Sequence, residues 1–152
     1  GVETPMYSST GQRNADIDAG AGRPAEELLT WFDRSTGELD AGFASLSEAE
    51  WGYPVVTAQG RTVPVSETPW MRTRELMVHA VDLDGGVTFA DLPEGFLTEL
   101  SDEIRAKRAA SGQEVPEVDG SHADVTAWLA GREHGPLTVA DGSPAPDLGP
   151  WL

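Results

Sequence analysis

The stretch Pro69-Trp-Met-Arg-Thr-Arg-Glu-Leu-Met-Val-His-Ala-Val-Asp-Leu83 carries the strongest pattern in this 152-residue sequence. Apolar residues recur at helical spacing on two sides of the segment. Pro69 suits the first turn of a helix, and Gly85-Gly86 ends the pattern. The sequence therefore predicts a helix over about residues 69–84 that is buried on most sides.

Glu75 and His79 lie four positions apart in this segment. On a helix these positions share one face, one turn apart, so the carboxylate and the imidazole can reach a single metal ion. The pair supplies only two ligands, whereas a catalytic zinc normally takes three from protein. Asp82 lies on the same face, either as a further ligand or as a partner that orients His79 through its other ring nitrogen. We favour the supporting role for Asp82.

The rest of the chain divides near residue 87 into a helical part and an α/β part. An apolar stripe predicts a helix over about residues 24–46, and a single stripe must be buried against another element. The expected elements around these helices are a short helix at 12–17 capped by Ser9, a hairpin at 55–64 with its turn at Gln59-Gly60, a strand at 87–89, a helix at 93–110 capped by Asp91, a strand at 115–118, a helix at 123–130 capped by Ser121, a strand at 137–139, and a tail whose Trp151-Leu152 packs back on the domain.

Composition excludes several functions. The formal net charge is −16, with 26 acidic and 10 basic residues. Such a surface repels nucleic acid and anionic lipid, so we expect neither as a partner. The absence of cysteine removes disulfides and a Cys nucleophile. No signal peptide and no apolar run of about 18 residues is visible, so we expect a cytoplasmic protein.

An anionic small molecule would need arginine on so acidic a protein. Arg132 follows the Trp128–Gly131 turn and is interpreted either as a cation near a helix C-terminus, which is common, or as a carboxylate clamp. Arg72 and Arg74 are interpreted as surface charges that flank the helix. His122 and His134 are interpreted as exposed or structural histidines, and completion of a metal site is the alternative for each.

Several motifs in one order resemble mycothiol-dependent maleylpyruvate isomerase, a family of DinB-like metal-dependent enzymes. They are Glu3-Thr-Pro-Met-Tyr7, Thr57-Ala-Gln-Gly-Arg-Thr-Val-Pro64, Glu67-Thr-Pro-Trp-Met-Arg72, Arg74-Glu75, His79-Ala-Val-Asp-Leu83 and Phe89-x-Asp-x-Pro93. The resemblance implies an α+β fold: part of a DinB-like helical bundle with a β-hairpin arm over residues 1–86, then a small α/β domain over residues 87–152.

The resemblance also implies a site and a reaction. Zinc is bound by two His and one Glu, and Glu75 and His79 match two of these ligands. Arg132 matches the substrate-recognising arginine. The family converts maleylpyruvate to fumarylpyruvate in gentisate breakdown. Zinc lowers the pKa of the mycothiol thiol, and the thiolate adds to the conjugated double bond, which rotates as a single bond before the thiolate leaves.

One departure concerns the remaining zinc ligand, which the family carries on a helix before the segment matching Glu3–Tyr7. This sequence begins after that helix. We therefore expect a fragment or an incomplete sequence, with missing N-terminal helices or a second chain packing on the bundle helices. The alternatives to the isomerase are a mycothiol-dependent S-transferase of the same superfamily and a non-catalytic fragment or binding module.

Overall fold

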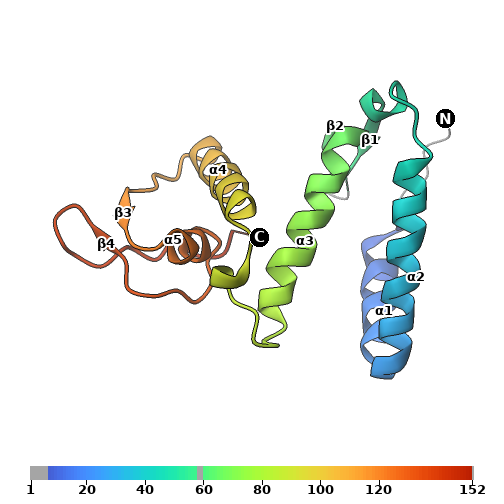
Figure 1. The fold of residues 1–152 in the computed structure, drawn as a ribbon, viewed down its shortest axis with the longest axis horizontal. Coiled ribbons are helices and arrows are strands. Elements are labelled where there is room, and N and C mark those ends of the chain that lie inside the picture. The colour runs from blue at the N-terminus through green and yellow to red at the C-terminus, as the bar shows by residue number, and fades with distance from the viewer. Residues whose placement is uncertain (1–6, 58–59, 152) are drawn as a thin grey trace. The chain divides into compact units, whose positions relative to one another are not determined.

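The computed structural model describes residues 7–57 and 60–151 and shows five α-helices with two small antiparallel sheets (Figure 1). This α+β composition confirms the predicted fold class. The chain forms two compact units, Gly1–Pro69 and Trp70–Leu152. Residues 3–6, Gln59 and Leu152, on which parts of the sequence predictions fall, lie outside the described residues.

The first unit holds two helices and a hairpin. Its elements are α1 (Thr10–Ala21), α2 (Ala25–Ala44), the 3-10 turns η1 (Glu50–Gly52) and η2 (Val65–Glu67), and the strands β1 (Pro54–Val56) and β2 (Thr62–Pro64). Ser9 caps α1 by accepting a hydrogen bond from the Gln12 amide, as predicted. β1 and β2 pair antiparallel, with Val55 opposite Val63, and Gly60 lies in the connecting turn with φ +79°.

Helix α2 leaves exposed the N-terminal part of the apolar stripe that the sequence predicts to be buried, and the later stripe residues, such as Leu39 and Phe43, are only partly buried. None of its residues, all of which the structure describes, is buried within this chain. Its exposed apolar side chains are Leu28, Leu29, Trp31 and Phe32. An apolar surface of this kind is typical of faces that take part in protein–protein contacts.

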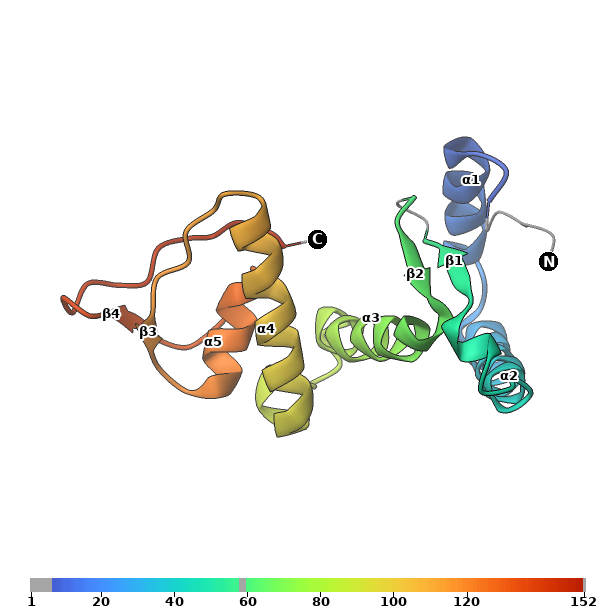
Figure 2. The same ribbon diagram turned by 90° about the horizontal axis from the view of Figure 1, so that it is seen from above.

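The second unit contains α3 and the elements that follow it, and the division between the units falls within the first turn of α3. Its elements are α3 (Thr68–Asp82), η3 (Phe89–Asp91), α4 (Glu94–Ala110), β3 (Val118–Asp119), α5 (His122–Leu129) and β4 (Thr138–Val139). Figures 1 and 2 show α5 packed beside α4, with the β3–β4 pair at the end of α5 remote from α3.

The core of this unit lies between α4 and α5. Leu100, Ile104 and Leu129 are completely buried at its centre. Trp70, Met77 and Val81 of α3 pack against the same cluster, so one of the two predicted apolar faces of α3 meets this core. The domain boundary near residue 87 stays a prediction. Within the structure, α3 packs with the elements that follow it.

Two local predictions, for a strand at residues 87–89 and for a helix cap at Asp91, are wrong. Residues 87–89 form no strand, because Thr88 and Asp91 close a capping box around η3 instead. Asp91 is therefore engaged with Thr88 and does not cap α4, whose N-cap is Pro93 without a side-chain hydrogen bond. In contrast, Ser121 caps α5 by accepting from the Asp124 amide, as predicted.

A buried arginine fastens the C-terminal tail. Arg108 is 5% exposed, and its guanidinium donates to the carbonyl oxygens of Leu129, Leu148 and Gly149 at 2.9 Å each. Arg108 also donates to the side chain of Gln113 at 2.6 Å. A buried cation needs such partners, and here neutral carbonyls supply them. The tail thus returns to the core, and Trp151 packs against it as predicted.

Among the helices of the described residues, none combines the length and the hydropathy that a membrane crossing requires.

We expect Arg108→Met to lower the free energy of unfolding by about 2–4 kcal/mol, because it removes the side-chain donor from the carbonyl groups of Leu129 and Gly149. Urea denaturation measures the change. Arg105→Met is the matched control on the same helix: Arg105 makes a 3.6 Å ion pair with the exposed Glu117, so its loss should cost less than about 1 kcal/mol. Equal stabilities of the two variants would refute the role given to Arg108.

Candidate functional site

Helix α3 places three ionisable side chains together in its C-terminal half. Glu75 Oε2 lies 3.3 Å from His79 Nε2, and Asp82 Oδ2 lies 2.9 Å from His79 Nδ1. The side chains of Glu75 and His79 are 45% and 61% exposed, so both can be reached from outside this unit. The helical spacing predicted from the sequence therefore does bring these groups together.

The separation of Glu75 Oε2 and His79 Nε2 fits a shared metal ion. Two ligands of a tetrahedral zinc, each about 2.0–2.1 Å from the ion, lie about 3.3–3.4 Å apart. The observed separation of 3.3 Å equals this value. The spacing of the pair is therefore compatible with two neighbouring ligands of one ion.

Asp82 contacts the ring nitrogen of His79 that does not face Glu75. The 2.9 Å contact with Nδ1 orients the imidazole and leaves Nε2 directed toward Glu75. This is the usual arrangement of a carboxylate that supports a metal-binding histidine. Asp82 therefore has the geometry of the supporting role that we favour from the sequence.

Asp82 also binds Arg132, which lies 50 residues later in the chain. Arg132 donates from Nε to Oδ1 at 3.1 Å and from Nη2 to Oδ2 at 3.0 Å, a bidentate pair. These hydrogen bonds from Arg132 lower the pKa of Asp82 below its ordinary value, against a smaller opposing effect of burial, and His79 lowers it further. Asp82 is therefore held as a carboxylate between His79 and Arg132.

The turn after α5 aims Arg132. Gly131 has φ +67°, and a Cβ atom there would lie 2.6 Å from the Gly149 carbonyl oxygen and 2.9 Å from Pro150 Cα. Only glycine fits this position, where the tail crosses the turn. Arg132 Nη1 then donates to the Ala130 carbonyl at 2.6 Å, which fixes the guanidinium from a second side.

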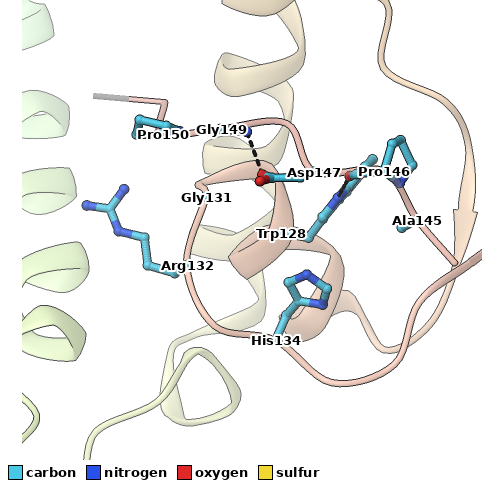
Figure 3. Close-up of a pocket in the computed structure, with 9 residues that line it drawn as sticks. All are labelled: Trp128, Gly131, Arg132, His134, Ala145, Pro146, Asp147, Gly149 and Pro150. Carbon is cyan, nitrogen blue, oxygen red and sulfur yellow. Dashed lines mark hydrogen bonds between the residues drawn. The ribbon is translucent and has the colours of Figure 1, made fainter.

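Arg132 also lines a pocket of about 370 Å³ between this turn and the C-terminal tail (Figure 3). The other lining residues are Trp128, Gly131, His134, Ala145, Pro146, Asp147, Gly149 and Pro150. In Figure 3 the Arg132 side chain extends away from Trp128 and His134, so its guanidinium is directed toward Asp82.

The two other histidines lie apart from Glu75 and have partners of their own. His122 Nδ1 contacts Glu94 Oε1 at 2.5 Å, and His134 Nδ1 contacts the Gly135 carbonyl oxygen at 2.6 Å. Across residues 7–57 and 60–151, no group of three His, Cys, Asp or Glu side chains is arranged to hold a metal. A zinc at Glu75 and His79 would therefore need a ligand from outside the described residues.

One residue of the site was misjudged from the sequence. Arg74, interpreted as a surface charge, is 7% exposed and donates to Glu75 Oε1 at 3.3 Å. Neighbouring positions on a helix do not face each other, so spacing gave no sign of this contact. Its only sequence signal was the position next to a candidate ligand on a helix with two apolar faces.

Comparison with known proteins identifies the family of this chain. The family model described as the mycothiol maleylpyruvate isomerase N-terminal domain matches residues 1–84. Two crystal structures, of mycothiol-dependent maleylpyruvate isomerase and of a histidine-to-alanine mutant of that enzyme, each align with a TM-score of 0.85 at 37% identity. Each alignment covers 95% of this chain and 69% of the other. No curated protein matches significantly.

The matched segment includes Glu75, His79 and Asp82, and the alignment with the solved structures spans nearly all of this chain. The chain belongs to the mycothiol-dependent maleylpyruvate isomerase family.

Proposed function

We propose that the protein isomerises maleylpyruvate to fumarylpyruvate with mycothiol as thiol cofactor, at a zinc held in part by Glu75 and His79. The observation that supports this most directly is the continuous line of contacts from Glu75 through His79 and Asp82 to Arg132. It joins a pair of side chains with metal-ligand spacing to a cation suited to a carboxylate substrate.

Zinc, when bound, would supply the charge that lowers the pKa of a thiol and so makes mycothiol a nucleophile near neutral pH. The chain contributes Glu75 Oε2 and His79 Nε2 as ligands, with Asp82 fixing the tautomer and orientation of the imidazole. A thiol brought by a cofactor is consistent with a chain that contains no cysteine.

Arg132 is suited to bind one carboxylate of the substrate. Its contacts with Asp82 and Ala130 use Nε–H and one N–H on each Nη nitrogen. Of the five N–H donors of a guanidinium, the two that remain without a hydrogen bond to the described residues lie at the end of the fork, where a carboxylate binds bidentately. Arg132 can thus keep Asp82 and accept an anion together.

The third ligand of the zinc would come from a further protein segment. The exposed stripe of α2 and the two-ligand set of α3 both call for further protein, and N-terminal helices or a second chain would supply both. This proposal completes the metal site without His122 or His134, which have other partners.

We expect Glu75→Ala and His79→Ala each to weaken zinc binding by more than about 100-fold, because each removes a direct ligand, beyond the effect of outer partners. Competition with a chromophoric chelator measures zinc affinity, and an assay with maleylpyruvate and mycothiol measures activity. His122→Ala is the matched histidine control and should keep full zinc affinity. Full zinc occupancy in both Glu75→Ala and His79→Ala would refute the assignment of these two residues as zinc ligands.

We expect Arg132→Ala to lower kcat/KM for maleylpyruvate by about 10–100-fold, the range of a lost charged hydrogen-bond pair. Zinc should remain bound, because Arg132 is not a ligand. Arg132→Lys should recover only part of the loss, since lysine lacks the planar fork. Steady-state kinetics measure this change. If Arg132→Ala has the same kcat/KM as the wild type, Arg132 does not bind the substrate.

We expect Leu28→Lys to lower the free energy of unfolding of the full-length protein by about 2 kcal/mol, because it places a charge in a covered apolar face. Glu27→Lys, at the neighbouring position of α2, is the control. Urea denaturation of both variants decides: a change within about 0.5 kcal/mol for Leu28→Lys would show that the stripe faces water.

A further inference from the structure

We propose that Arg74 is a positioning residue of the metal site, which holds one oxygen of Glu75 so that the other faces His79. This inference rests on the proposed zinc site. It adds the buried guanidinium of Arg74, together with the α4 carboxylate of Glu103 that anchors it, to the machinery of the site.

The two carboxylate oxygens of Glu75 contact different residues. Nη2 of Arg74 donates to Oε1 at 3.3 Å, while Oε2 lies 3.3 Å from His79 Nε2. A carboxylate on a half-exposed side chain has several rotamers open to it. A fixed donor on Oε1 restricts these rotamers to those that present Oε2 beside the histidine.

The donor itself is buried and paired. Arg74 is 7% exposed, and its Nη1 makes a 2.5 Å ion pair with Glu103 Oε1 on α4. Glu103 is fixed in turn by the indole N–H of Trp70 at 2.8 Å and by Lys107 at 2.9 Å. The ring of Trp151 lies 5.4 Å from the Arg74 guanidinium. A buried side chain that contacts both Glu103 and Trp151 can orient its neighbour.

The fork shape of arginine is needed for this arrangement. Nη1 and Nη2 of one planar group bind two different carboxylates, on Glu103 and on Glu75. A lysine ammonium is a single compact head that cannot hold both in fixed directions. The buried Nε–H has no partner among the described residues, so the two terminal nitrogens carry the pairing that offsets burial of the charge.

A purely structural role makes a different prediction. In that case Arg74 only neutralises Glu103 and packs on Trp151, and its contact with Glu75 is incidental. Lys107 provides the comparison, because its Nζ also pairs with Glu103 Oε1 and also lies over the Trp151 ring, 4.7 Å from its centroid. Lys107 shares these two partners of Arg74 and makes no ion pair with Glu75 in the described chain.

The test is the zinc affinity of the full-length protein, measured by chelator competition, for wild type, Arg74→Met, Arg74→Lys and Lys107→Met. We expect Arg74→Met to bind zinc about 10–100-fold more weakly, the range for loss of a partner that orients a ligand. Lys107→Met should stay within about twofold of wild type. The visible absorption of bound Co²⁺, which reports ligand geometry, should change in Arg74→Met and not in Lys107→Met.

Arg74→Lys keeps a cation near Glu103 and so guards against a variant that does not fold. With a melting temperature near that of wild type, we expect it to lose about tenfold in zinc affinity. The proposal is overturned if both Arg74 variants bind zinc like wild type, or if Lys107→Met loses as much affinity as Arg74→Met. Wild-type protein that binds no zinc, or Glu75→Ala that binds it normally, would instead refute the proposed metal site and the role of Arg74 with it.

Discussion

The carboxylate of Glu103 fastens helix α3 to the core of its unit. It accepts hydrogen bonds from Trp70, Arg74 and Lys107, two of them on α3 and one on its own helix. Partial burial opposes its ionisation, but the hydrogen bonds and the two positive charges outweigh this and lower its pKa. Without an ionised acceptor there, a buried guanidinium would face the core unpaired, which is among the costliest arrangements in a protein.

From Arg74, a series of side-chain contacts continues along α3 to Asp82 and ends at Arg132, which follows α5. Arg74 holds Glu75, Glu75 faces His79, His79 contacts Asp82, and Asp82 binds Arg132. The candidate metal ligands therefore have a cation behind one end and a carboxylate behind the other. Because Asp82 contacts both His79 and Arg132, the orientations of the imidazole and of the guanidinium depend on the same carboxylate.

The three arginines Arg74, Arg108 and Arg132 have different partners in this acidic protein. With a net charge of −16, an anionic substrate meets a repulsive surface and needs a local positive group. The Arg108 guanidinium donates to the carbonyl groups of Leu129 and Gly149, and the Arg74 guanidinium pairs with Glu103. Both arginines are therefore occupied by contacts within the protein. Arg132 combines a guanidinium that is paired with Asp82 and a side chain that is 19% exposed.

Local patterns in the sequence determined the helices, the caps at Ser9 and Ser121 and the spacing of Glu75 and His79, because all of these depend on contacts within one or two turns. The strand expected at residues 87–89 failed on an equally local competitor, the capping box of η3. Only the tertiary structure decided that Arg74 is buried and that Asp82 meets Arg132 across 50 residues. Such contacts depend on how α3 packs on α4 and α5, and helical periodicity carries no information about the partner that a face will meet.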